Sequence, residues 1–208
     1  MKRIDVPGFE RKFQRDIDPW NYATSRFEYF KRNALLQACG RYKHGRVLEL
    51  GCAIGETTRF LGPLSLRLLA LDGSPTAISE AKKRVRSPHI SFMQAVLPRE
   101  MPRGCFDLIV VSELAYYLRD VDLAALAKRI SLCLARRGKV VLLHHRQHFP
   151  DAAQPGELAQ DQLTRRLQSI ARQVYRQRFP RFDVVALRRS EGPRRVRRRL
   201  RSARRYFK

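Results

Sequence analysis

Arg46-Val47-Leu48-Glu49-Leu50-Gly51-Cys52-Ala53-Ile54-Gly55-Glu56 is the stretch that decides the fold. Its apolar first part, residues 46–50, predicts a buried β-strand that runs directly into glycines. Such a turn lets the backbone bend sharply and approach a ligand closely. Asp72 lies 21 residues after Gly51, at the end of the next apolar run. Because a carboxylate there can accept hydrogen bonds from both hydroxyls of a ribose, we expect a nucleotide or nucleoside site.

The same turn argues against a dinucleotide. A dinucleotide-binding turn has glycine at its first, third and sixth positions, which here are Gly51, Ala53 and Glu56. A glutamate beside a pyrophosphate is electrostatically unfavourable. Glu49 points the same way, since a carboxylate near the turn suits a ligand that carries sulfonium and ammonium groups. The pattern therefore favours a cationic nucleoside over NAD.

The rest of the chain alternates expected strands and helices. Alternation at this spacing predicts a parallel sheet with both faces covered by helices. After Pro150 the pattern changes to one helix and two paired strands. The polar residues 1–17 are expected to form a flexible N-terminal arm, 18–189 one domain, and 190–208 a basic tail. The expected helices are 24–38, 57–61, 75–86, 121–135 and 157–168, and the further expected strands are 66–71, 90–93, 105–111, 139–143, 171–177 and 182–187.

The charge of the chain is strongly positive. The 208 residues include 43 Lys and Arg against 19 Asp and Glu, a net charge of +24, and residues 188–208 hold eleven of the basic residues and one acid. Such a field attracts polyanions, although a solvated surface is the simpler interpretation. No apolar run approaches the roughly 20 residues of a membrane span, and residues 1–10 do not resemble a secretory signal. We therefore expect a cytoplasmic protein.

The four cysteines show no CxxC pair and no histidine at zinc-finger spacing. We expect neither a disulfide framework nor a metal site.

Three segments together resemble class I S-adenosylmethionine-dependent methyltransferases. Leu48–Gly55 resembles their first motif, Leu69-Ala70-Leu71-Asp72 their second, and Phe106–Glu113 their fourth-strand motif. The resemblance implies an α/β, Rossmann-like class I methyltransferase fold with a mostly parallel seven-stranded sheet and helices on both faces. It also implies S-adenosyl-L-methionine as the cofactor.

A narrower resemblance is to the nodulation protein S family. It rests on Asp18-Pro19-Trp20, Phe27-Glu28 with Lys31 nearby, Leu97-Pro98, Ser112–Leu118 and the His-rich segment after residue 143, and covers most of residues 18–188. It implies an N-methyltransferase whose acceptor is an amino sugar, an oligosaccharide or another small amine. It does not specify the oligomeric state.

The resemblance assigns the cofactor-binding residues. The turn residues surround the methionine portion, with Glu49 beneath them. Asp72 holds the ribose, Gly73 leaves room for the adenine, and Ser112 lies near the sulfonium. Lys31 is expected to pair with the cofactor carboxylate, as the corresponding basic residue does in the family. The full set is Lys31, Glu49, Gly51, Cys52, Ala53, Gly55, Asp72, Gly73, Ala95, Val96 and Ser112.

The chain departs from the wider pattern on the adenine side. Many class I enzymes carry an acid after the third strand, where this chain has Gln94, Ala95 and Val96. We expect a backbone amide of Ala95 or Val96 to bind the adenine instead.

The acceptor site is expected after the fourth and fifth strands, where open α/β sheets bind substrates. An amine acceptor must lose a proton before methyl transfer, which calls for a carboxylate or imidazole. We assign Glu113 to accept a hydrogen bond from the acceptor ammonium, His145 to take the proton, and Tyr117 to line the acceptor site. His144 and His148 are weaker candidates, and the tyrosines would also fit an ordinary core.

Two other functions stay open. The charge would suit a methyltransferase of RNA or another polyanion, and residues 194–205 would bind nucleic acid nonspecifically. However, no Asn-Pro-Pro-Tyr-like motif follows the fourth strand. The missing adenine-side acid leaves room for a non-catalytic basic binding protein that retains the fold.

Overall fold

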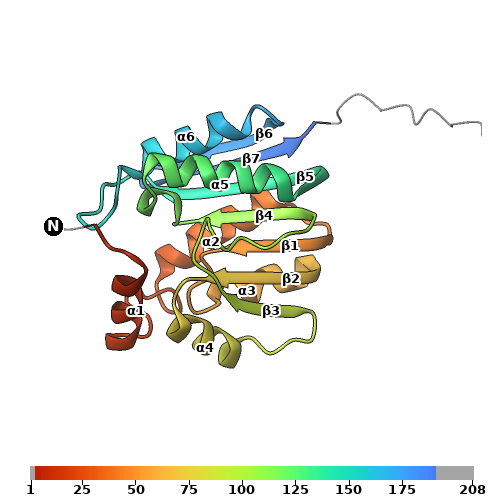
Figure 1. Cartoon of the computed structure of the whole chain (residues 1–208). Coiled ribbons are helices and arrows are strands. Elements are labelled where there is room, and N and C mark those ends of the chain that lie inside the picture. The colour runs from red at the N-terminus through yellow and green to blue at the C-terminus, as the bar shows by residue number, and fades with distance from the viewer. Residues whose placement is uncertain (1–2, 191–208) are drawn as a thin grey trace, which may run out of the picture.

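The strand before the glycine turn is an interior strand of a seven-stranded sheet, between β2 (Ser65–Asp72) and β4 (Phe106–Ser112) (Figure 1). The computed structural model describes residues 3–190. In chain order its elements are α1 (Val6–Arg15), α2 (Arg26–Cys39), β1 (His44–Leu50), α3 (Glu56–Leu61), η1 (Gly62–Leu64), β2 (Ser65–Asp72), α4 (Pro75–Arg84), β3 (Ile90–Gln94), β4 (Phe106–Ser112), η2 (Ala115–Tyr117), α5 (Asp120–Cys133), β5 (Leu134–His145), α6 (Gly156–Leu167), β6 (Ala171–Arg178) and β7 (Phe182–Arg189).

The order of strands across the sheet is β3-β2-β1-β4-β5-β7-β6. Each neighbouring pair from β3 to β5 is parallel, and β7 runs antiparallel to both β5 and β6. The expected mostly parallel seven-stranded sheet is confirmed. The strand order reverses at β1 and β4, and ligands of open α/β sheets bind outside the carboxyl ends of strands at such a point.

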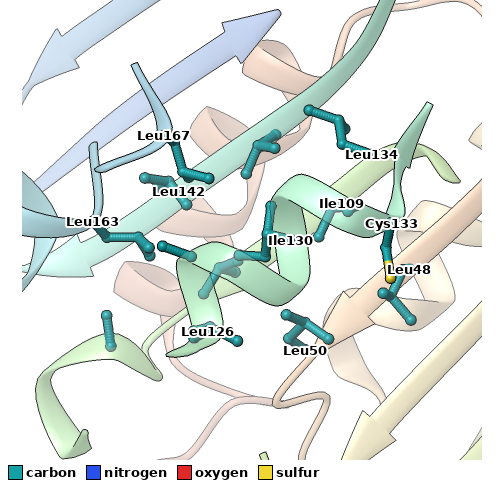
Figure 2. Close-up of a cluster of buried hydrophobic side chains, with 14 of the residues drawn as sticks. Leu48, Leu50, Ile109, Leu126, Ile130, Cys133, Leu134, Leu142, Leu163 and Leu167 are labelled. Carbon is teal, nitrogen blue, oxygen red and sulfur yellow. The ribbon is translucent and has the colours of Figure 1, made fainter. Parts of the chain in front are cut away.

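The central strands are apolar on both sides because helices cover both faces of the sheet. Leu48 and Ile109 face one hydrophobic core, while Val47 and Leu108 face the other, as the two-residue period of a strand requires. Figure 2 shows the first core, where Leu126, Ile130 and Cys133 of α5 lie over Leu48, Leu50 and Ile109 and are joined by residues of α6. This packing holds the strand ends, and so the glycine turn, in place.

The expectation of a flexible N-terminal arm is wrong for residues 6–15, which form α1. The Asp5 side chain caps this helix by accepting a hydrogen bond from the Gly8 amide. Glu10 accepts hydrogen bonds from the hydroxyls of Ser74 (2.6 Å) and Thr76 (2.5 Å) at the start of α4. Sparse apolar residues made the segment look unstructured, but its stability comes from these distant contacts.

Other boundaries differ by a few residues. The helix expected over residues 121–135 ends at Cys133, and β5 begins at Leu134 with a register shift against β4. The predicted tail lies outside the described residues, apart from Ser190. Within residues 3–190, no helix combines the length and apolar character that crossing a bilayer requires.

Candidate functional site

A cavity of about 710 Å³ opens at the carboxyl ends of β1, β4 and β5 and is closed on one side by α1. Of the fourteen site residues predicted from the sequence, thirteen line it. The exception is Gly55, which lies behind the turn at the start of α3. Most of the residues predicted from the sequence therefore lie at one cavity, and their roles stay predictions.

The glycine turn has a backbone that requires its glycines. Gly51 has φ +79° and Gly55 has φ +84°, a left-handed conformation that side chains rarely adopt. A Cβ on Gly55 would also lie 3.2 Å from the Cβ of Ala81. The Gly51 and Cys52 amides both donate to the Leu71 carbonyl, which joins the turn to the end of β2.

Asp72 fixes the other side of this turn. Its Oδ2 accepts a hydrogen bond from the Ala53 amide (2.9 Å), and its Oδ1 accepts one from the Ser74 amide (2.9 Å). Burial raises the pKa of Asp72 above its usual range, against the effect of these hydrogen bonds. The carboxylate is therefore held rigidly at the cavity wall, with further lone pairs available to a ligand.

Glu49 is a second buried acid beneath the turn. It is 2% exposed, and its Oε2 accepts a hydrogen bond from the Thr58 hydroxyl at 2.6 Å. Burial raises the pKa of Glu49 to about 7, and the nearby Asp72 charge adds to the shift. A cation bound in the cavity would favour the ionised forms of both acids.

Two neighbouring cations of α2 form the opposite wall. The Nζ of Lys31 lies 2.9 Å from Oε1 of Glu28 and 3.9 Å from Oε1 of Glu113. Lys31 is thus already paired within the protein. Arg32 is only 7% exposed, and its Nε is buried without a hydrogen-bond partner.

The sequence assignment missed both Arg32 and Glu28. The three-residue spacing of Glu28 and Lys31 was the available signal for the ion pair. For Arg32, the sequence held no more than its position beside Lys31.

The adenine side differs from the expectation. The Ala95 amide donates to the Asp72 carbonyl (2.8 Å), and the Val96 amide donates to Oε2 of Glu100 (2.6 Å). Neither amide is free to bind a ligand in this structure, so an adenine would have to displace Glu100 to reach Val96. Ala95 and Val96 still line the cavity.

Glu113 and His145 form a hydrogen-bonded pair at the ends of β4 and β5. Glu113 has φ +55°, and its Oε1 accepts from the His145 amide at 3.0 Å. Its Oε2 bonds to Nδ1 of His145 at 2.7 Å and accepts from the Tyr116 hydroxyl at 2.6 Å. Burial alone would raise the pKa of Glu113, but the charge of Lys31 and the bond from His145 lower it to about 2.

An ionised carboxylate only accepts hydrogen bonds, so Nδ1 of His145 must be the donor. In neutral His145 the lone pair is then on Nε2, and this ring lies in the cavity wall. Such a carboxylate–imidazole pair suits proton transfer.

The other predicted aromatic and imidazole groups divide between cavity and core. Tyr117 lines the cavity, and its ring lies edge-on to Phe9 of α1 at 4.7 Å between centroids. His144 is buried, which lowers its pKa, and its Nε2 accepts a hydrogen bond from the Ala115 amide. His148 is exposed and lies outside the cavity wall. His144 therefore has a structural role, and His145 is the imidazole available to a ligand.

Comparison with known proteins agrees with this geometry. A family model described as nodulation protein S (NodS) matches residues 8–152. Nodulation protein S of Bradyrhizobium diazoefficiens is 40% identical over 114 residues, covering 54% of this chain and 54% of that protein. The Sinorhizobium fredii protein is 36% identical over 106 residues, covering 50% and 49%. The chain thus spans about half the length of the curated relatives it matches.

A solved structure is similar over a longer part of the chain. It is the N-methyltransferase NodS from Bradyrhizobium japonicum in complex with S-adenosyl-L-homocysteine, with a TM-score of 0.75 and 25% identity. The similarity covers 88% of this chain and 98% of that one. The family match runs from α1 through β5 and the histidine segment, and the chain therefore belongs to the nodulation protein S family.

Proposed function

We propose that this protein is an S-adenosyl-L-methionine-dependent N-methyltransferase that acts on an amine acceptor. The observation that carries the proposal is the Glu113–His145 pair, which shares one cavity with the glycine turn and Asp72. The similarity to an N-methyltransferase solved with S-adenosyl-L-homocysteine supports the same assignment.

The residues of the cavity fit this cofactor. When bound, S-adenosyl-L-methionine supplies a methyl group on a positively charged sulfonium. The buried acids Glu49 and Asp72 would favour a cationic nucleoside, and Asp72 would accept hydrogen bonds from its ribose. Arg32, whose buried Nε has no partner, would hold the cofactor carboxylate together with Lys31. Arg32 thus extends the role first assigned to Lys31 alone.

His145 is the general base in this proposal. Its Nε2 would take a proton from the acceptor ammonium, which frees the nitrogen lone pair that attacks the methyl group. Glu113 would stabilise the resulting imidazolium, because it stays ionised and already accepts the Nδ1 hydrogen. Glu113 already accepts three hydrogen bonds and lies beside the Lys31 ammonium, so in this proposal it acts through His145 and not by direct contact with the acceptor.

The acceptor class is an amino sugar or an oligosaccharide that carries one, with other small amines as the alternative. Tyr117 and Phe149 line the cavity near His145, with the Phe149 ring 5.4 Å from that imidazole. Aromatic rings with a polar edge suit a sugar, which has apolar faces and a polar rim. The similar solved structure is an N-methyltransferase, which supports a nitrogen atom as the methyl acceptor.

A methyl-transfer assay tests the proposal. The purified chain and labelled cofactor are offered deacetylated chitooligosaccharides, small amines and RNA in parallel. We expect transfer to an amine, and we expect His145→Gln to slow it by about 100-fold while binding of S-adenosyl-L-homocysteine is unchanged by calorimetry. Transfer to RNA alone, or full activity in His145→Gln, would contradict the assignment.

A further inference from the structure

Arg181 is held beside the His145 end of the cavity by the backbone. It directly precedes β7, whose first residue, Phe182, lies opposite His145 in the antiparallel pairing of β5 and β7. The Arg181 carbonyl accepts a hydrogen bond from the Arg146 amide at 2.9 Å. The sheet therefore places Arg181 next to the proposed base, and Arg181 lines the cavity.

The guanidinium group of Arg181 lies over the ring of Phe27, with its central carbon 3.8 Å from the ring centroid. Phe27 packs in turn against His145 and Phe182, whose ring centroids lie 5.5 Å and 5.9 Å from its own. A guanidinium over an aromatic ring gains electrostatic attraction, and its N–H donors, which point outward in its plane, stay available to a ligand. Arg181 and His145 thus contact the same phenylalanine, so a single small molecule can reach both.

The charges that line the whole cavity are nearly balanced. Its wall includes seven acids and six cations. Each of the seven acids is already engaged in a hydrogen bond or an ion pair within the protein. The surroundings of each cation, and not the total charge, therefore decide which of them can bind an anionic ligand.

Three of the six cations are already assigned. Lys31 forms an ion pair with Glu28 at 2.9 Å, and Arg119 forms one with Asp122 at 2.9 Å. Arg32 is assigned above to the cofactor carboxylate, together with Lys31. These three cations are therefore poor candidates for binding a group on the acceptor.

The other three cations are Arg3, Arg99 and Arg181. Within residues 3–190, none of their side chains has a hydrogen bond or an ion pair. Arg3 precedes α1, and Arg99 follows β3, the edge strand on the far side of the sheet from β7. Arg181 is the one of these three whose ring contact joins it to His145.

The chemistry of this position favours an oxyanion. The N–H donors of a guanidinium match the two oxygens of a carboxylate or a phosphate. The acceptor amine arrives at His145 as an ammonium group, and Lys31, 5.7 Å from the Phe27 centroid, is a second cation nearby. An acceptor whose only charge is the ammonium is repelled by both cations. An anionic group on the same molecule replaces the repulsion from Arg181 with attraction.

We propose that Arg181 determines acceptor specificity by binding an oxyanion, a carboxylate or a phosphate, on the molecule that carries the amine. The acceptor is then an amino compound, such as an amino sugar, with an acidic substituent. Arg181 orients the anionic end while His145 removes the proton at the amine end. This inference rests on the proposed N-methyltransferase function and narrows its acceptor class.

Matched pairs of amines test the inference. The pairs are ethanolamine and phosphoethanolamine, β-alaninamide and β-alanine, and glucosamine and glucosamine-6-phosphate, so each differs by one anionic group. We expect kcat/KM of the wild type to be higher for the anionic member of at least one pair by about 10-fold or more, because a charge-assisted hydrogen bond is gained. Preference within the phosphate pairs or within the carboxylate pair shows which oxyanion is bound.

Two variants separate a local contact from net charge. Arg181→Gln should abolish the preference, with binding of S-adenosyl-L-homocysteine unchanged by calorimetry. Arg99→Gln removes the same charge from the other side of the cavity and should keep the preference. The inference is overturned if no pair shows a preference, if the preference survives in Arg181→Gln, or if both variants lose it equally. Weaker binding of S-adenosyl-L-homocysteine by Arg181→Gln would also overturn it, because it would place Arg181 at the cofactor.

Calorimetric binding of the same pairs to protein loaded with S-adenosyl-L-homocysteine needs no turnover. Tighter binding of an anionic member, lost in Arg181→Gln, would support the oxyanion site even if no amine were methylated, and the N-methyltransferase proposal alone would then fail. Methyl transfer to amines without any preference for the anionic members would leave that proposal in place and overturn the role of Arg181.

Discussion

Relative to the wild type, Glu49→Gln is expected to have a higher free energy of unfolding at pH 8 than at pH 4.5 in the absence of ligand. This is expected although the substitution removes a charge from the cofactor site. Glu49 is buried, and burial raises its pKa from 4.5 to about 7. Folding therefore disfavours its ionised form. The glutamine keeps the side-chain length and can still accept the hydrogen bond from Thr58.

The sign and size of the effect follow from linkage. Below pH 4.5 the Glu49 carboxyl is mainly neutral in both the folded and the unfolded chain, so its burial does not lower the free energy of unfolding through ionisation. As the pH rises through the folded pKa, the wild type loses stability, because the unfolded chain has already released the proton. A rise from 4.5 to about 7 corresponds to roughly 3 kcal/mol between pH 4.5 and pH 8. The buried glutamine amide costs about 1–2 kcal/mol at every pH, so it cancels from the pH difference.

Urea denaturation of both proteins at pH 4.5 and pH 8 measures this double difference. We expect the variant to gain roughly 3 kcal/mol relative to the wild type on going from the lower to the higher pH. Affinity for the cationic cofactor should rise with pH in the wild type as Glu49 ionises, and this rise should be absent from the variant. If the stability difference between the two proteins does not change with pH, Glu49 is not held in its neutral form, and the electrostatic account of the site fails.

Glu113→Gln should lower kcat by about 100-fold, because His145 loses the carboxylate that orients it, with little change in calorimetric binding of S-adenosyl-L-homocysteine. The pKa of Glu113 is lowered to about 2, so its contribution to stability is present above pH 4.5 and is lost as the pH falls toward 2. In urea denaturation, the free energy of unfolding of Glu113→Gln should therefore lie below that of the wild type at pH 7, and the difference should be smaller at pH 3. Asp72→Asn should weaken binding of the same nucleoside by about 10- to 100-fold, because a charged acceptor for the ribose is lost; unchanged affinity would exclude Asp72 from the ribose site.

The sheet and its order of elements could be predicted because their signals are local. Apolar runs such as residues 106–112 belong to strands buried on both faces, and Ser74-Pro75 caps and begins α4, the helix expected from residue 75. The helix α1 was missed for the opposite reason. The contacts that hold α1 in place join Glu10 to Ser74 and Thr76, which lie more than sixty residues away in the sequence. No local sequence pattern predicts such contacts.

Thirteen of the predicted site residues line one cavity, because residues at the carboxyl ends of parallel strands must meet at one edge of the sheet. What the sequence could not show is which polar atoms are already occupied. The Val96 amide donates a hydrogen bond to Glu100, and Lys31 forms an ion pair with Glu28. Arg32, which has an unpartnered buried Nε, went unnoticed beside Lys31. Occupancy depends on side-chain direction, which the residue type and spacing do not specify.

Glu113 illustrates the consequence for mechanism. From sequence, a glutamate after the fourth strand fits either direct contact with an ammonium group or support of a base. The structure engages Oε1 with the His145 amide and Oε2 with both Tyr116 and the His145 ring. Oε2 already accepts two hydrogen bonds, and the remaining acceptor site is on Oε1, which lies 3.9 Å from the Lys31 ammonium. A second ammonium group at Oε1 would be repelled by Lys31. The arrangement therefore favours proton removal by His145, with Glu113 behind it.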